Sequence, residues 1–517
     1  MADVVDIFVP LDEEDAPLGL AVERALGWPR GAAGAVTVLR RSLDARKGRP
    51  LGHRLRVRAA RAGEAAVDAP APVRSRVWPA GKERPRVVIV GSGPAGTWAA
   101  LRLAEGGVAA TIVEQGKPVQ PRRHDLAELT RGRLAPRSNY CFGEGGAGTY
   151  SDGKLYTRAK DREGIAAVIG DLVRFGAPAE IAVESRPHVG SNRLPKVLTS
   201  LREHLEGAGV TYQFEADVAG LRLERGRVRA VVLAGGGELP AEVVVLAVGH
   251  SARPLYEWAA RAGLALERKG IAIGVRLEHP QLLIDRLQYG GAAGHPRLPP
   301  AFYELATEAE GRGVYSFCMC PGGWIVPAAT EPEGVVVNGM SLSRRDSPFA
   351  NAGFVVAIEP EDFGPAGAGP LAGVEFQRAV ERAAFVAGGG RFRAPAQRLG
   401  DFLAGRASKA VGASSYRPGT TPSDLALVLP PFVTTALRAG LRRLGDRLPA
   451  FLHADAVLVG VETRTSAPLR FLRDPETLVA RGLEGLYPIG EGAGYAGGIV
   501  SAALDGARVA ERILASA

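Results

Sequence analysis

The sequence predicts an α/β protein: a Rossmann-type cofactor-binding domain with an inserted β-rich α+β domain and a small N-terminal α+β domain. The run Val87–Val90 is apolar throughout, as in a strand buried within a parallel sheet. It leads directly into glycines at the G-x-G-x-x-G spacing, and a helical segment follows. A second apolar run then ends on an acid, Glu114. Strand, glycine turn, helix, strand and acid in this order form a dinucleotide-binding fingerprint.

Each glycine of this turn has a separate physical role. Gly91 permits the tight turn, Gly93 lets the backbone approach a pyrophosphate, and Gly96 lets the helix pack closely on the strand. The helix that begins near Pro94 offers free N–H groups to the phosphates. Glu114 lies where a carboxylate can accept hydrogen bonds from both ribose hydroxyls. The residues predicted to bind the cofactor here are Gly91, Ser92, Gly93, Pro94, Ala95, Gly96 and Glu114.

Length and charge restrict the possible functions. A chain of 517 residues is long enough for two or three domains. The net charge of +9 arises from scattered arginines interleaved with acids, without a basic stripe that carries aromatics, so no nucleic-acid partner is expected. No apolar run approaches the length of a membrane span, and the early residues are acidic, so we expect a cytoplasmic protein without a membrane partner. The three cysteines are too few for a disulfide framework or a structural zinc site.

Composition shifts divide the chain into four parts. A Pro- and Ala-rich stretch, 66–79, separates a small N-terminal unit from the nucleotide-binding core. Beyond about residue 263 the pattern becomes rich in strands and loops, and the nucleotide-binding pattern returns near the C-terminus. The predicted organisation is an N-terminal α+β domain with its linker (1–80), the first part of the cofactor-binding domain (84–262), an inserted substrate or cap domain (263–455) and the C-terminal return (456–517).

Three separated segments point to one elongated cofactor. The fingerprint is the first, a strand ending near Gly249 is the second, and a strand ending in Gly490 and Glu491 before a helix is the third. A nicotinamide dehydrogenase completes its site in one continuous domain, whereas this chain returns after roughly two hundred residues. The sequence therefore predicts non-covalent FAD. No second G-x-G-x-x-G turn follows a strand, so NAD(P)H is expected only as a transient electron donor.

The arrangement resembles the FAD-binding fold of the glutathione-reductase type, in which Arg122 would lie near the pyrophosphate. Glu491 stands where that fold more often has Asp. In the glycine-dense loop FGEGGAGTYSDGKL, bare backbone can approach the flavin. The further residues assigned to the cofactor are Arg122, Gly145, Gly146, Val218, Gly249, Gly490, Glu491, Gly498 and Ile499.

Long segments resemble a family of bacterial uncharacterised FAD-dependent dehydrogenases, also called NAD(FAD)-utilising dehydrogenases. The segments are FGEGGAGTYSDGKL, RPHVGSNRL, VVVLAVGHSAR, IAIGVRLEHP, GVYSFCMCPGGWIVPA, PLAGVEFQR, APAQRLGDFL, VETRTSAP and LYPIGEGAGYAGGIVSAALDG. The similarity extends over nearly the whole chain. It implies a flavoprotein with an inserted substrate domain, but it implies no particular substrate.

Four residues are candidates for catalysis. Arg464 precedes the last cofactor segment, where its fork can bind a substrate carboxylate or stabilise reduced flavin. His188 has arginines and turn residues close by, which favours an acid or base role. Cys318 and Cys320 are two residues apart in a strand-like run, so both thiols would share a face towards the flavin. Packing is the favoured interpretation of this pair, because buried cysteine usually acts as a small hydrophobe and a C-x-C disulfide is strained.

These features predict an FAD-dependent oxidoreductase that moves two electrons between the flavin and a small organic substrate. Two alternatives remain open: an FAD-dependent monooxygenase, and a flavin-binding redox switch whose N-terminal domain docks a partner. A switch would bury the flavin and expose a patch on residues 1–75. An enzyme instead needs an apolar pocket with a few polar groups at the flavin.

Overall fold

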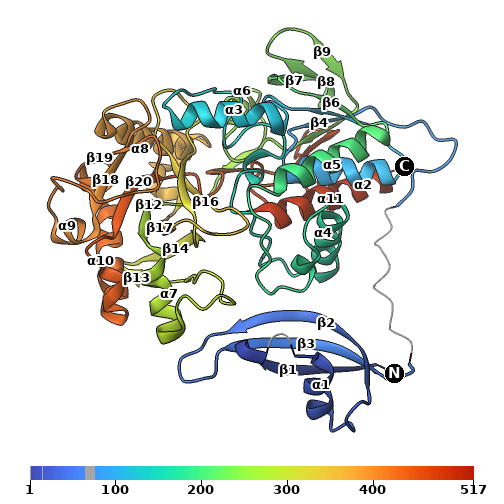
Figure 1. The fold of residues 1–517 in the computed structure, drawn as a ribbon. Helices are drawn as coiled ribbons and strands as arrows, with labels where there is room; N and C mark the ends of the chain where they lie inside the picture. Colours follow the sequence, from blue (N-terminus) through green and yellow to red (C-terminus); the bar gives the residue numbers. More distant parts are fainter. Residues whose placement is uncertain (1, 14–15, 65–75, 517) are drawn as a thin grey trace.

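The structure is a computed structural model that describes residues 2–13, 16–64 and 76–516. A small N-terminal unit is formed by a three-stranded antiparallel sheet of order β1-β3-β2, with one helix packed against it (Figure 1). Its elements are β1 (Asp3–Pro10), α1 (Leu18–Leu26), β2 (Ala33–Asp44) and β3 (Gly52–Arg61). Its own apolar core includes Ile7, Val22 and Val57. Most of the predicted linker lies outside the described residues.

After the N-terminal unit, the chain forms a five-stranded parallel sheet of order β22-β10-β4-β5-β6. Its strands are β4 (Val87–Val90), β5 (Ala110–Val113), β6 (Thr211–Gln213), β10 (Val243–Leu246) and β22 (Leu486–Pro488). Because all strands are parallel, their carboxyl ends share one edge. The three segments predicted to converge on the cofactor therefore do lie side by side, on β4, β10 and β22.

Helices cover this sheet, and a small antiparallel sheet of order β7-β8-β9 extends from it (Figure 1). The helices are α2 (Pro94–Glu105), α3 (Val119–Thr130), α4 (Arg162–Arg174), α5 (Leu194–Gly207), α6 (Arg253–Arg261) and α11 (Ile499–Ala515). The small strands are β7 (Val218–Glu224), β8 (Arg227–Leu233) and β9 (Glu238–Pro240). No helix in the described ranges is both long and apolar enough to cross a bilayer.

Helix α11 packs directly along α2, although the two are about four hundred residues apart in sequence. The contact depends on Gly506, because a Cβ built there would lie 2.0 Å from the carbonyl oxygen of Ala95. A real Cβ cannot occupy that position unless a helix moves. The terminal helix is thus held against the helix that begins the glycine turn.

The inserted part of the chain forms a seven-stranded sheet of order β13-β14-β17-β12-β20-β18-β19. Its strands are β12 (Ile271–Pro280), β13 (Ala306–Ala309), β14 (Arg312–Cys320), β17 (Phe349–Ile358), β18 (Ala394–Arg398), β19 (Thr420–Pro422) and β20 (Val457–Glu462). The strand β20 pairs with β12 and β18. The chain therefore returns towards the parallel sheet only after β20, and not at residue 456.

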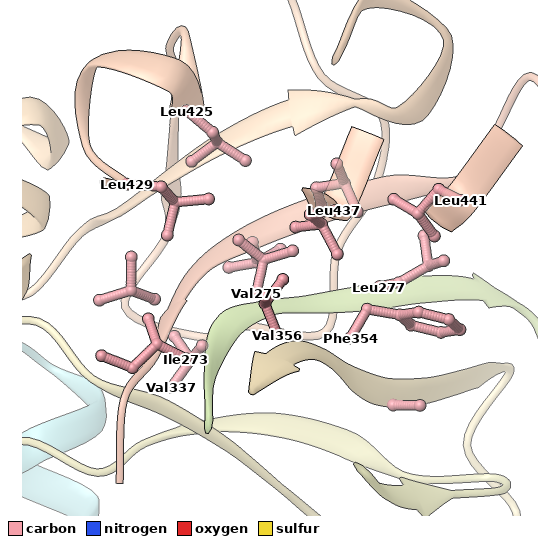
Figure 2. Packing of buried hydrophobic residues seen from close by; sticks show 14 of the residues in the cluster. Ile273, Val275, Leu277, Val337, Phe354, Val356, Leu425, Leu429, Leu437 and Leu441 are labelled. Atoms are coloured by element: carbon pink, nitrogen blue, oxygen red, sulfur yellow. The ribbon is translucent and has the colours of Figure 1, made fainter. Parts of the chain in front are cut away.

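Helices α8 and α10 pack on this sheet, and apolar side chains of β12 and β17 meet those of α10 (Figure 2). The helices of this part are α7 (Gln281–Tyr289), α8 (Ala372–Gly388), α9 (Leu399–Ala404) and α10 (Pro431–Arg447). Two further strand pairs flank it: β15 (Trp324–Pro327) with β16 (Val337–Met340), and β11 (Leu266–Arg268) with β21 (Leu469–Phe471).

Replacing Gly506 by alanine should destabilise the protein by about 1–3 kcal/mol, the usual cost of overpacking a tight contact. The matched control is Gly170→Ala in α4, where a Cβ would meet nothing within 4 Å. That control should stabilise the helix by up to about 1 kcal/mol, because alanine is the better helix former. Chemical denaturation of both variants measures the difference, and equal stabilities would contradict the tight α2–α11 contact.

Candidate active site

One cavity of about 2370 Å³ extends from the glycine turns of the parallel sheet to strand β14 of the seven-stranded sheet. Gly93, Gly490, His188 and Cys318 are all among its lining residues. Pockets for single small ligands usually measure about 300–1,000 Å³. The cavity therefore has room for an elongated cofactor together with a second molecule.

The glycine turn combines close packing with an open backbone surface. A Cβ at Gly91 would lie 2.4 Å from the carbonyl oxygen of Ala247, and one at Gly96 would lie 2.0 Å from the carbonyl oxygen of Gly91. At Gly93 the nearest described atom would be 4.0 Å away, so this glycine leaves bare backbone facing the cavity. Gly93 is the N-cap of α2 and provides no side-chain cap, which leaves N–H groups of the first turn available for phosphate oxygens.

Glu114 ties this turn to the glycine-dense loop. One of its carboxylate oxygens accepts hydrogen bonds from the backbone N–H and the hydroxyl of Ser92, at 3.0 and 2.9 Å. The other oxygen accepts from the N–H groups of Gly116 and Gly143, each at 2.9 Å. The carboxylate lines the cavity, so it is held in a defined orientation at the end of β5.

The structure corrects the predicted role of Arg122. Its side chain is fully buried, and its guanidinium donates to the carbonyl oxygens of Asn139, Glu144 and Gly146 at 2.8–2.9 Å. It is not among the residues that line the cavity. Instead of contacting a pyrophosphate, Arg122 holds the glycine loop in place from beneath. The reason is that this loop folds over α3 and leaves its carbonyl groups pointing at the arginine.

Two loop glycines assigned to the cofactor have different surroundings. Gly145 donates its N–H to the carbonyl of Ser92 at 3.0 Å, and a Cβ there would lie 2.2 Å from the hydroxyl of Thr149. Gly146 lines the cavity opposite Gly93. Gly145 thus supports the turn, whereas Gly146 is placed to contact a bound molecule.

The remaining assigned residues lie along the cavity wall. A Cβ at Gly249 or Gly498 would meet nothing within 4 Å, so both glycines leave open space. Glu491 is half-buried there, and burial raises its pKa to about 7, although the Lys269 ammonium acts in the opposite direction. The assigned residues lining this part are Val218, Gly249, Gly490, Glu491, Gly498 and Ile499.

Arg464 lines the cavity, but its guanidinium group is already hydrogen-bonded to Glu381 and Thr330. Its Nε and Nη2 atoms donate to the two carboxylate oxygens of Glu381 at 3.1 and 2.8 Å, and Nη1 donates to Thr330 at 2.6 Å. Arg253 donates to the same carboxylate from the other side at 3.0 and 2.8 Å. This corrects the prediction that the Arg464 fork is available for a substrate carboxylate.

The carboxyl group of Glu381 is 1% exposed and lies between these two arginines. Burial alone would raise its pKa, but Arg464 and Arg253 lower it to about 2. The carboxylate is therefore ionised at neutral pH and compensates two buried cations. Because Arg253 begins α6 and Arg464 follows β20, this cluster fixes the two sheets relative to each other.

The cavity also contains a polar cluster centred on Asp152. The Lys154 ammonium lies 3.0 Å from its carboxylate, and Arg345 and His188 lie 3.5 Å away. The hydroxyl of Ser341 donates to the same carboxylate. Burial lowers the pKa of His188 below its usual value, so the imidazole is neutral at neutral pH. Asp152 and Lys154 were not predicted as site residues. The only signal for them in the sequence was their place in SDGKL, at the end of the glycine loop.

Cys318 and Cys320 lie at the end of β14, next to this cluster. The Lys154 ammonium is 3.6 Å from the sulfur of each. Cys318 lines the cavity, whereas Cys320 is fully buried behind it. The regular strand predicted for the pair is interrupted, because the register with β17 shifts between Phe317 and Cys320.

Two family models match the chain. Residues 270–465 match a model described as FAD-dependent protein, C-terminal domain-like, and residues 86–123 match an FAD binding domain. A Clostridium beijerinckii protein described as uncharacterized is 45% identical over 434 residues, which are 83% of this chain and 80% of that protein. The chain belongs to this family of FAD-dependent proteins. The turn at Gly93, the open glycines and the free start of α2 fit FAD as the cofactor of an oxidoreductase fold.

Several solved structures resemble the chain at low similarity. A GidA-related protein from Thermus thermophilus is 19% identical, with 37% of this chain and 73% of that chain covered and a TM-score of 0.24. The flavin-dependent brominase Bmp2 is 13% identical, with 84% and 79% covered and a TM-score of 0.37. Glycine oxidase from Bacillus cereus is 12% identical, with 84% and 96% covered and a TM-score of 0.31.

Replacing Gly93 by valine should yield folded protein that has lost most of its FAD. The added Cβ would approach no protein atom more closely than the Gly146 Cα at 4.0 Å, but the side chain would occupy the space in which a pyrophosphate approaches the backbone. The comparison variant is Gly96→Val, which should fail to fold because its Cβ would collide with the Gly91 carbonyl. Flavin absorbance and circular dichroism separate the two results. Full FAD occupancy in Gly93→Val would show that the turn does not bind the cofactor.

Replacing Glu381 by glutamine should destabilise the protein by about 3–5 kcal/mol, because two buried arginines lose their counter-charge. The matched control is Glu333→Gln, whose exposed pair with Arg382 should contribute almost nothing. The lowered pKa of Glu381 gives stability that is present above the ordinary carboxyl pKa of about 4.3 and is lost as the pH falls towards 2. Denaturation at several pH values should therefore show the wild type losing its advantage in acid.

Proposed function

We propose that the protein is an FAD-dependent oxidoreductase that transfers two electrons between the flavin and a small anionic organic substrate. The glycine turns at Gly93, Gly146 and Gly490 form what we call the glycine cradle. The observation that carries this proposal is that one continuous cavity joins this cradle to the Asp152 cluster. Bound FAD supplies the electron-transfer chemistry in such a site. The protein residues bind and orient the two molecules and keep bulk water away.

The cavity wall beyond the cradle favours an anion. Arg158 and Arg344 are exposed there, and neither forms an ion pair within the described ranges. Lys154 and Arg345 reach the same space from the Asp152 cluster. Arginine binds carboxylates and phosphates through parallel hydrogen bonds, so these are the substrate groups that we propose. A pyridine nucleotide carries such phosphates, and we propose NAD(P)H as the transient electron donor.

His188 is the proposed proton-transfer residue. It is neutral at neutral pH, lines the cavity and lies 3.2 Å from the Ser341 hydroxyl. The segment carrying His188 pairs with the end of the glycine loop, because the Leu155 N–H donates to the Pro187 carbonyl at 3.1 Å. A neutral imidazole fixed in this way can accept a proton from a substrate at the cavity surface.

The N-terminal unit lies against the cavity, which supports a role in an enzyme site. Its strand β2 pairs with the chain near Glu184: the Arg41 N–H donates to the Val183 carbonyl at 2.7 Å, and Ser185 donates back to Arg41 at 2.8 Å. Arg40, Arg41, Leu43 and His53 of this unit line the cavity. This unit thus contributes directly to the cavity wall, although Val4, Phe8 and Leu20 of the same unit are exposed.

The test is anaerobic reduction of the purified holoprotein by carboxylates, phosphates, NADH and NADPH, followed through the flavin absorbance. With a compound that reacts, replacing both Arg158 and Arg344 by alanine should raise KM tenfold or more and leave kcat within a few-fold. The matched control is Arg382→Ala, an arginine outside the cavity. An unchanged KM would contradict the anionic substrate, and a hydroxylated product formed with oxygen uptake would instead identify a monooxygenase.

A further inference from the structure

Cys318 lies in a β-bulge with an unusual backbone conformation. Along β14 the chain advances from Phe317 to Cys320 while β17 advances only from Gly353 to Asn351, so one extra residue is accommodated. Cys318 takes a φ of +47°, a region that residues other than glycine rarely adopt. Bulges and such strained residues concentrate at functional sites. The bulge is therefore the first sign that the thiols do more than fill space.

A buried arginine holds this bulge in place. Arg276 donates through Nη1 to the carbonyl of Cys318 at 2.9 Å and to the amide oxygen of Asn351 at 3.0 Å. Its Nη2 donates to Glu462 at 2.9 Å. A Cβ at Gly339 would lie 2.3 Å from Nη1 of Arg276 and 2.9 Å from the Cys320 sulfur, so glycine is required there. The surroundings of the pair are thus tightly determined.

The Lys154 ammonium lies between a carboxylate and two sulfurs. It is 3.0 Å from Asp152 and 3.6 Å from the sulfurs of both Cys318 and Cys320. A cation beside a thiol favours the thiolate, which is the nucleophilic form. The Cys320 thiol donates to the carbonyl of Cys318 at 3.4 Å, so it lies directly behind the residue that faces the cavity.

We propose that Cys318 and Cys320 form a dithiol–disulfide centre that reacts with small-molecule disulfides entering the cavity, with Cys318 as the attacking thiolate. The pairing suits this chemistry because the accessible sulfur can attack and the buried sulfur can complete the exchange. The bend at Cys318 also removes the extended geometry that strains a C-x-C disulfide in a regular strand. This activity goes beyond the proposed function, since it requires no flavin turnover.

The exchange proceeds in two balanced steps. The Cys318 thiolate attacks one sulfur of the small disulfide, the S–S bond breaks, and the released thiolate takes a proton from water. Cys320 then gives its proton to water and attacks the Cys318 sulfur, which breaks the mixed disulfide and releases the second thiolate, and this thiolate takes up the proton that Cys320 lost. The cysteine pair loses two electrons, and the small disulfide gains them as it becomes two thiols.

The electrostatics distinguish the two sulfurs. A hydrogen bond from the Cys320 side chain to the Cys318 side chain lowers the pKa of Cys318 well below its usual value; burial opposes this, and Lys154 and Arg276 reinforce it. The same contact, together with burial, raises the pKa of Cys320. The charged and titratable groups that act on the pair are Asp152, Lys154, Tyr156, Arg276, Tyr303, Glu462 and Glu491. His188 and Arg345 lie next to these groups, in contact with Asp152.

The first test uses oxidised glutathione as the probe, on holoprotein carrying Cys141→Ser so that only the pair can react. Peptide mass spectrometry should show the loss of two hydrogens from the peptide that contains both cysteines. Adding Cys320→Ser should stop the reaction at a glutathione adduct on Cys318, and Cys318→Ser should prevent both products. Failure to form the disulfide, or an adduct that forms equally on Cys320, would overturn the proposal.

The second test measures how Lys154 controls the thiolate. In the same Cys141→Ser protein, Lys154→Met should slow iodoacetamide alkylation of Cys318 at neutral pH at least tenfold and move the pH midpoint of that reaction upwards. Lys154→Arg should restore most of the rate, and Lys160→Met, an exposed lysine outside the cavity, should change nothing. FAD content and circular dichroism verify folding. If the rate and pH dependence of Cys318 alkylation were unchanged in Lys154→Met, the proposal would be overturned, whether or not the variant still reduces its flavin.

Discussion

The whole site depends on backbone segments that approach one another more closely than a Cβ would allow. A Cβ at Gly91 would collide with the carbonyl of Ala247, one at Gly492 with that of Gly249, and one at Gly506 with that of Ala95. These contacts connect the first glycine turn, the end of β10 and the C-terminal return. Parallel strands bring the three segments to one edge, but only glycine lets them interlock there. The cradle is thus a property of three distant parts of the chain.

Buried ion pairs fix how the remaining parts meet this cradle. Arg473 pairs with Asp505 of α11 at 2.6 Å, and Arg102 of α2 pairs with Asp171 of α4 at 2.5 Å. Each pair joins segments that are far apart in sequence, and each is almost completely buried. Such pairs cost desolvation energy, so their net stabilisation is small, but breaking one leaves an uncompensated charge. We infer that their main effect here is to exclude alternative packings of the helices and sheets.

The fold was largely predictable because its strongest signals are local. The β4 run, the glycine turn, α2 and the acid at Glu114 follow one another within about thirty residues, and each has its own physical requirement. The seven-stranded sheet was predicted only as a β-rich insertion. Its strand order joins segments nearly two hundred residues apart, and single-strand patterns contain no information about such pairing.

Site residues whose role depends on backbone conformation could be predicted from the sequence. Site residues whose role depends on their side-chain partners could not. Gly93, Gly249 and Gly490 line the cavity as their turns indicated. Arg122 and Arg464 looked like free cations, because their partners, three carbonyls and Glu381, come from elements whose positions depend on the tertiary fold. The link between Lys154 and the two cysteines was hidden for the same reason, since about 160 residues separate them.

One loop connects the cofactor cradle with the thiols. It starts at Gly143, whose N–H binds the Glu114 carboxylate, and it ends at Lys154, whose ammonium reaches Cys318 and Cys320 on the other sheet. Arg122 holds the loop from beneath. The acid of the cradle and the cation beside the sulfurs are therefore set by the same dozen residues. We infer that a shift of this loop would move the Lys154 ammonium relative to the two sulfurs together with the backbone that holds the Glu114 carboxylate.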